Sequence, residues 1–327
     1  MVDSKAVLGR LFIRNQSAMS YLSSVFLLIS RRFFFNSIIG LMSLFLAASV
    51  HAQTDSDHTK KYNTGLEPYK FLWSVGAVSD YRSKGIDQTF GLPALQVEFG
   101  TILPNNFYVG TWNSNVTSGA GYPGALLETD LFVGWFTDIG ANHINLGVYG
   151  ALFPGSNVAN YISSPINNSM SSGLVHNGDV FLAVRRGSIT IQQNVTFTNA
   201  GNMLSPTGQS TAGSAYTNLT GAFPMPSWTW LDGGWSLITH AGYQFINNYS
   251  AASYFDWKFG VEKKIANMFT VDLAYVQTNA KGNCSVAATS AQPYCYNKYQ
   301  NASGVGTGPT KNAGDAAVIL SVKIANF

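Results

Sequence analysis

Acidic side chains with apolar neighbours are the residues of this chain best suited to chemistry. Glu128 and Asp130 occupy alternate positions among Leu127, Leu131 and Val133. In a β-strand this spacing puts the carboxylates on one face and the hydrocarbon on the other. A carboxylate is costly to bury without a partner or water. The pattern therefore predicts an acidic, hydrated face whose chemistry is the attraction of cations.

The same alternation assigns a larger set of polar side chains to one inward face. Seven acids share this face with three bases, which leaves an excess of negative charge. Two interpretations stay open: a weakly cation-leaning passage for small solutes or ions, or a network of paired charges that plugs a narrow interior. The set consists of Glu98, Glu128, Asp130, Asp179, Asp256, Glu262 and Asp272, the bases Arg185, Lys258 and Lys323, and the neutral His240.

Catalysis is not predicted. The sequence contains no G-x-S-x-G motif, phosphate-binding loop or metal-ligand spacing, and its histidines are isolated along the chain. A lipid hydrolase would need a serine and a histidine facing outward, whereas His240 alternates with Ser236 and Gln244 on the inward face. We expect a protein that is not an enzyme and has no cofactor and no bound metal.

The segment from Ser79 to Gln88 carries alternating charges at Asp80, Arg82 and Lys84, followed by Gly85, which permits a tight turn. In one interpretation these charges form the mouth or a constriction of a pore. In the other, the segment is a strand-end hairpin whose Asp80 and Arg82 pair with each other.

The two cysteines, Cys284 and Cys295, lie close together in a polar segment. An exported chain meets an oxidising compartment, so we expect a disulfide within a loop.

The composition indicates what surrounds these residues. The 327-residue chain is 46% hydrophobic and 13% aromatic but only 11% charged, where soluble domains have about 25% charged residues. The many aromatic residues exclude disorder. Apolar residues are scattered rather than gathered in long runs after the N-terminus, which argues against membrane helices. A transmembrane β-barrel fits, because alternate residues of each strand face lipid.

Alternation and connection lengths together predict twelve antiparallel strands in an all-β, up-and-down barrel. Eleven strands are clear, and bacterial barrels have even numbers of strands. A weaker strand at 216–223 makes the twelfth. It also makes the connections alternate between short periplasmic turns and long external loops, with the cysteine loop outside. The clear strands are 69–79, 92–102, 106–116, 126–137, 143–153, 178–186, 188–199, 234–246, 253–264, 268–280 and 316–326.

The two ends of the chain have separate roles. Residues 1–52 carry basic residues, an apolar run and the ending Val50-His51-Ala52, and predict a cleaved signal peptide. Residues 53–68 form a periplasmic tail, and 69–327 the barrel. Cleavage leaves 14 basic and 15 acidic residues, so no nucleic-acid partner is expected. Phe327 would be recognised by the outer-membrane assembly machinery. It lies on the opposite parity from Val322, which predicts a bulge near the terminus.

Several segments resemble one family in the order in which they occur. They are 78–88, Pro93 to Gln96, Phe107 to Val116, Glu128 to Leu131, Tyr216 to Pro224 and Phe269 to Val276. Together they resemble the TorF-family porins over nearly the whole mature chain. Ser83 and Lys84 depart from the family pattern, which has an aromatic residue and an arginine there. The resemblance implies a pore-forming barrel in the bacterial outer membrane, surrounded by the lipid bilayer. A closed structural or adhesin-like barrel that acts through its long external loops is the alternative.

Overall fold

The computed structural model describes residues 69–157, 174–227, 233–266, 268–285, 291–301 and 306–326. The predicted signal peptide 1–52, the tail 53–68 and the terminal Phe327 lie outside the described residues, so these expectations stay predictions. No helix among the described residues is long and apolar enough to cross a membrane.

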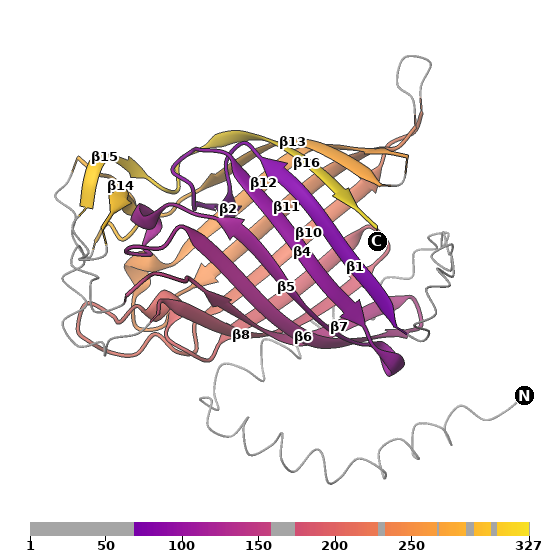
Figure 1. Ribbon diagram of the computed structural model, residues 1–327, viewed down its shortest axis with the longest axis horizontal. Coiled ribbons are helices and arrows are strands. Elements are labelled where there is room, and N and C mark those ends of the chain that lie inside the picture. The colour runs from indigo at the N-terminus through magenta and orange to yellow at the C-terminus, as the bar shows by residue number, and fades with distance from the viewer. Residues whose placement is uncertain are drawn as a thin grey trace, which may run out of the picture. The chain divides into compact units, whose positions relative to one another are not determined.

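Twelve antiparallel strands close into a barrel, in which β1 pairs with β4 on one side and with β16 on the other (Figure 1). The predicted all-β barrel fold is therefore confirmed, and β10 supplies the weaker twelfth strand. The barrel strands are β1 (Lys70–Val78), β4 (Ala94–Ile102), β5 (Phe107–Asn115), β6 (Leu127–Ile139), β7 (Asn142–Leu152), β8 (His176–Arg186), β9 (Ile189–Thr196), β10 (Ala215–Pro224), β11 (Trp235–Phe245), β12 (Tyr254–Ile265), β13 (Phe269–Thr278) and β16 (Ala317–Ala325).

The barrel wall has an apolar outer face. On β6, Leu131 and Val133 are half exposed, at 52% and 51%, because they point away from the lumen. The inner face packs large rings over glycines. A Cβ on Gly134 would lie 2.3 Å from the Tyr108 hydroxyl, and one on Gly147 would lie 2.7 Å from the Phe181 ring. Glycine on these strands therefore makes room for aromatic rings inside the barrel.

The two ends of the barrel differ in the length of their connections. Turns between β4 and β5, β6 and β7, β8 and β9, and β12 and β13 are short, and the start of β1 and the end of β16 lie at the same end. The opposite end carries the long connections, with the short 3-10 turns η2 (Ser118–Ala120), η4 (Ala200–Asn202) and η5 (Ser250–Ala252); η1 (Pro104–Asn106) is at the short-turn end.

Pairing of β16 with β1 and β13 keeps one register, which reaches Ala325 opposite Ser74 of β1. The bulge expected near the terminus is therefore absent from the described part of this strand.

Two small hairpins interrupt the long connections. One is β2 (Arg82–Ser83) with β3 (Ile86–Asp87), and the other is β14 (Cys295–Gln300) with β15 (Gly306–Asn312). Neither was predicted, because these short strands lack the apolar alternation that reveals the barrel strands.

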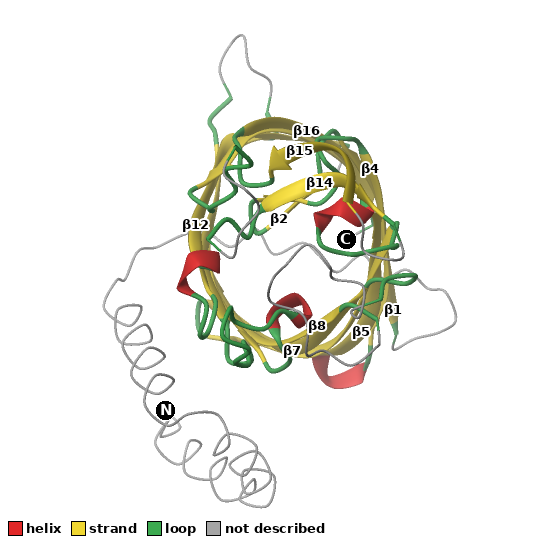
Figure 2. Ribbon diagram, turned by 90° about the vertical axis from the view of Figure 1, so that its left-hand side faces the viewer, coloured by secondary structure: helices red, strands yellow, loops and turns green. Residues whose placement is uncertain are grey.

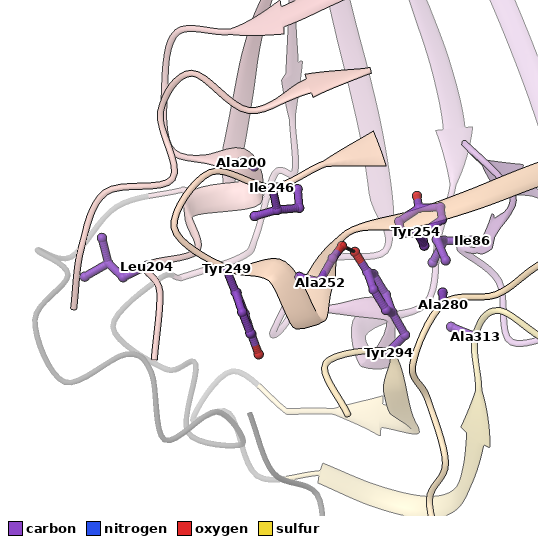
Figure 3. Close-up of a cluster of buried hydrophobic side chains, with 10 residues drawn as sticks. All are labelled: Ile86, Ala200, Leu204, Ile246, Tyr249, Ala252, Tyr254, Ala280, Tyr294 and Ala313. Atoms are coloured by element: carbon purple, nitrogen blue, oxygen red, sulfur yellow. Dashed lines mark hydrogen bonds between the residues drawn. The ribbon is translucent and has the colours of Figure 1, made fainter. Parts of the chain in front are cut away.

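Buried apolar side chains gather among the long connections. In one cluster Ile86 of β3 packs with Ile246, Tyr254 and Tyr294, and the Tyr294 hydroxyl donates to the Ala252 carbonyl at 2.5 Å (Figure 3). A second cluster contains Tyr81, Val116, Phe153 and Val175. The long-connection end is therefore a packed layer rather than a set of independent loops.

Candidate functional site

The hairpin that joins β1 to β4 turns into the barrel. Viewed from the long-connection end, β2 lies within the ring of barrel strands (Figure 2). Gly85 has φ of +78°, and a Cβ there would lie 2.5 Å from Thr278 and 2.8 Å from Asp256. Only glycine combines this left-handed backbone with such a close approach to the opposite wall. We call residues 80–88 the lumenal hairpin.

The lumenal hairpin contacts wall strands far from β1. Lys84 Nζ lies 3.5 Å from Asp179 Oδ2 on β8 and 5.1 Å from the ring centre of Tyr216 on β10. The Tyr254 hydroxyl of β12 donates to the Lys84 carbonyl at 3.0 Å. The Tyr81 hydroxyl donates to Glu128 on β6 at 2.9 Å. The segment therefore extends across the lumen.

Charged groups fix the base of the lumenal hairpin. Arg82 donates from Nε and Nη2 to Asp80 Oδ2, at 2.9 and 2.6 Å, and from Nη1 to the carbonyls of Ala313 and Asp315, both at 3.0 Å. Asp87 Oδ2 lies 2.5 Å from Lys311 Nζ on β15 and 3.6 Å from Arg82. The lumenal hairpin is thus tied to the connection that carries the cysteines.

Electrostatics differ between the two hairpin carboxyls, which lie outside the membrane-spanning strands. Burial acts to raise the pKa of Asp87, but the hydrogen bond from Lys311 and the charge of Arg82 outweigh it and lower that pKa. Burial raises the pKa of Asp80 despite its hydrogen bonds from Arg82.

This difference predicts an acid-sensitive tether. A carboxyl whose pKa is depressed in the closed hairpin stabilises it above the ordinary value of about 4, and this contribution is lost as the pH falls through the lowered pKa. Asp87→Asn removes the tether at every pH. We expect the variant to show increased motion of residues 80–88 at pH 7, measured by spin-label mobility at Ser83→Cys. The unchanged chain should gain that mobility only below about pH 4. Equal mobility of both chains at pH 7 would contradict this prediction.

A cavity of about 420 Å³ lies beside the lumenal hairpin. Seven residues assigned from the sequence line it: Asp80, Arg82, Lys84, His240, Asp256, Lys258 and Asp272. Gln96, Trp112 and Tyr216 line it too.

One cluster in this wall joins residues that the sequence analysis kept apart. His240 Nε2 lies 2.7 Å from Asp256 Oδ2, and the Tyr216 hydroxyl lies 2.9 Å from both His240 Nε2 and Asp256 Oδ1. They come from three neighbouring strands, so separation in sequence concealed the contact. Asp256 is held among donors and is only 3% exposed.

The remaining assigned residues lie elsewhere on the inner face. Asp179 accepts from Tyr149 at 2.7 Å, and Glu98 accepts from Ser74 at 3.2 Å. Glu128 and Asp179 are buried, while Arg185 is exposed near the short turn after β8. Glu262 stands directly opposite Asp272. Asp130 Oδ1 is buried without a hydrogen-bond partner, and Lys323 pairs in register with Gly76.

The charge balance inside the barrel differs from the count made on the strands alone. The lumenal hairpin brings Arg82 and Lys84 against the wall acids, and Lys84 pairs with Asp179. The acidic excess is therefore smaller at this level than the strand sequence predicts. No cluster of three or more metal-ligating side chains occurs among the described residues.

Cys284 and Cys295 are joined by a disulfide, as predicted. In the chain-entropy model such a short loop adds roughly 2 to 3 kcal/mol, but it closes a connection and not the barrel. We expect Cys284→Ala with Cys295→Ala to assemble into barrels in normal yield, measured by the fraction of folded protein on semi-native gels. Loss of the folded band would contradict this expectation, and Cys295→Ser alone is the control for a free thiol.

Comparison with known proteins gives a family but no activity. A family model described as "Bacterial protein of unknown function (Gcw_chp)" matches residues 62–302. The chain belongs to the Gcw_chp family. No curated protein matches the sequence.

Solved structures similar to this Gcw_chp member include outer-membrane barrels. They are the NanC porin (TM-score 0.39, 6% identity, covering 77% of this chain and 98% of that one), OccAB3 of Acinetobacter baumannii (0.34, 7%, 79% and 64%) and LpxR from Salmonella typhimurium (0.33, 8%, 78% and 99%). At these values the matches support no statement about function.

Localisation follows from the fold of this Gcw_chp protein. A closed barrel satisfies every strand edge, and its outward face is apolar. In a bacterial protein these two properties are those of an outer-membrane barrel. The chain is therefore a protein of the bacterial outer membrane, in contact with the lipid bilayer.

Proposed function

We propose that this barrel is a porin-like passage for small solutes and ions, narrowed by the lumenal hairpin and leaning weakly toward cations. One observation carries the proposal: a loop built around Gly85 crosses the lumen, yet leaves a polar cavity of about 420 Å³ beside it. A barrel that served only as an anchor would have no need of such a cavity. The resemblance of residues 78–88 to the TorF-family porins supports the same conclusion.

The size of the barrel is consistent with a narrow passage. Barrels of about eight strands are filled by side chains, and those of 16 to 18 strands leave an open channel. Twelve strands lie between these limits. A hairpin folded inward would then restrict the passage to small solutes.

The direction of selectivity rests on the inward acids. Glu128, Asp130 and Asp179 come from β6 and β8, and Lys84 is the cation that faces them from the lumenal hairpin. A water-filled space lined mainly by negative charge concentrates cations. We therefore propose a modest preference for cations.

The pairing of charges favours one alternative. Lys84 with Asp179 and Lys258 with Asp272 are both within 3.5 Å, and paired charges of this kind could also close a structural or adhesin-like barrel that acts through its packed long connections.

Single-channel recording in a planar bilayer tests the proposal. A passage gives discrete current steps with a reversal potential on the cation side in a potassium chloride gradient. Absence of steps from protein that runs as a folded barrel would refute the passage and favour the closed barrel. Steps with anion preference would refute the selectivity alone and would mean that Arg82 and Lys84 dominate the narrowest part.

A further inference from the structure

The cavity beside the lumenal hairpin has two chemically different sides. Its polar side includes Asp80 of the hairpin and Asp272 of β13. Its apolar side consists of Val78, Ala274, Val276 and Ile319, from β1, β13 and β16. At about 420 Å³ the volume falls within the range of about 300 to 1,000 Å³ that is typical of small-molecule sites.

Positive groups in the cavity already have acidic partners. Arg82 is 4% exposed at its side chain, and its guanidinium donates to Asp80 and to two backbone carbonyls. Lys84 pairs with Asp179, and Lys258 Nζ lies 3.2 Å from Asp272 Oδ2. An anionic ligand would have to compete with these carboxylates, so the cavity is poorly suited to anions.

Acceptor oxygens are left over. Asp80 and Asp272 each use one carboxylate oxygen in an ion pair, and in each the other oxygen, Oδ1, is buried without a hydrogen-bond partner. Asp80 as a whole is only 6% exposed. A buried carboxylate oxygen without a donor is costly. The cavity therefore lacks hydrogen-bond donors, preferably charged ones.

The apolar side decides what else the ligand carries. Ala274, Val276 and Ile319 face inward although the rest of the inner wall is mostly polar, and all three are less than 10% exposed. Trp112 lines the same cavity, 5.4 Å from the Tyr81 ring. A hydrated inorganic ion gains nothing from such a surface, whereas a short hydrocarbon chain does.

We propose that this cavity binds small organic cations that carry a primary ammonium group on a short hydrocarbon chain. The ammonium group donates to the free oxygens of Asp80 and Asp272, and the chain packs against the side formed by Val276 and Ile319. As the solute class of the passage, the assignment rests on the proposed function. Binding itself can be measured without any current.

Isothermal titration of the detergent-solubilised barrel tests the assignment, with n-butylammonium chloride as the probe. Sodium n-butyrate has the same chain with the opposite charge, and ammonium chloride has the charge without the chain. We expect saturable binding of n-butylammonium, weaker binding of ammonium and none of butyrate. Binding of butyrate as tight as that of n-butylammonium would overturn the sign of the site. Binding of ammonium as tight as that of n-butylammonium would overturn the role of the hydrocarbon.

Two variants locate the site, each checked for a folded barrel on semi-native gels. Asp272→Asn keeps the shape but removes a charged acceptor, and should weaken n-butylammonium binding at least about tenfold. Glu98→Gln is the matched control, because Glu98 is an inward acid that does not line the cavity. Ile319→Thr should reduce the advantage of n-butylammonium over ammonium. Equal weakening by Asp272→Asn and Glu98→Gln would mean that the overall lumen potential, and not this cavity, attracts the cation, which would overturn the proposal.

The two proposals can fail separately. A barrel that conducts but does not bind n-butylammonium refutes the ligand and leaves the passage. A barrel that binds n-butylammonium through Asp272 but never conducts supports the site and refutes the passage.

Discussion

Replacing Arg82–Asp87 with the dipeptide Asn-Gly should raise single-channel conductance severalfold. The six residues form the part of the lumenal hairpin that reaches β8, β10 and β12. At its base the Gln88 amide donates to the Tyr81 carbonyl at 2.8 Å. A two-residue turn of the Asn-Gly type can close a hairpin at this point. The change therefore removes the obstruction and leaves β1 and β4 paired.

The matched control shortens a connection that lies away from the lumen. Residues Pro206 to Gln209 are exposed at the tip of the connection between β9 and β10, and their replacement with Asn-Gly should leave conductance unchanged. Conductance is measured for both variants in one salt solution, after folded barrels are confirmed on gels. An unchanged conductance without Arg82–Asp87 would show that the lumenal hairpin does not limit the current.

The barrel wall could be predicted from the sequence because its physics is local. Lipid on one side and a polar lumen on the other force an alternation that each strand displays by itself. Predicted and observed strands agree to within a few residues, as for 268–280 and Phe269–Thr278. The weak strand at 216–223 was found from connection lengths, because an odd number of strands would have put the long cysteine connection at the short-turn end.

The interior could not be predicted to the same depth, because its contacts join distant parts of the chain. The sequence left open whether Asp80 and Arg82 pair or reach into the lumen, and the structure has both, since Lys84 extends to Asp179 while Arg82 holds Asp80. Alternation gave the face of His240 but not its contact with Asp256, which depends on the register of β11 against β12. Close packing at Gly85 is the one local signal that pointed inward.

Selectivity should change sign most readily at β6. Glu128 and Asp130 are neighbouring inward positions, and Lys84 is the cation of the lumenal hairpin that acts on both. Glu128→Gln with Asp130→Asn removes two negative charges and leaves Lys84 facing Asp179 alone. We expect the reversal potential in a tenfold potassium chloride gradient to move toward anions, within the limit of about 59 mV that such a gradient sets for a monovalent ion.

The control for this variant removes two negative charges from exposed positions, with Asp138→Asn and Asp315→Asn. The Asp138 side chain is 77% exposed at the short-turn end, and Asp315 is exposed in the connection before β16. Exposed charges are screened by salt within about 10 Å at 0.1 M, so the control should leave the reversal potential nearly unchanged. Equal shifts in both variants would mean that selectivity is set at the ends of the barrel. No shift in either would mean that ions do not pass the level of Glu128, and the acids there serve instead to hold Tyr81 and Lys84 in place.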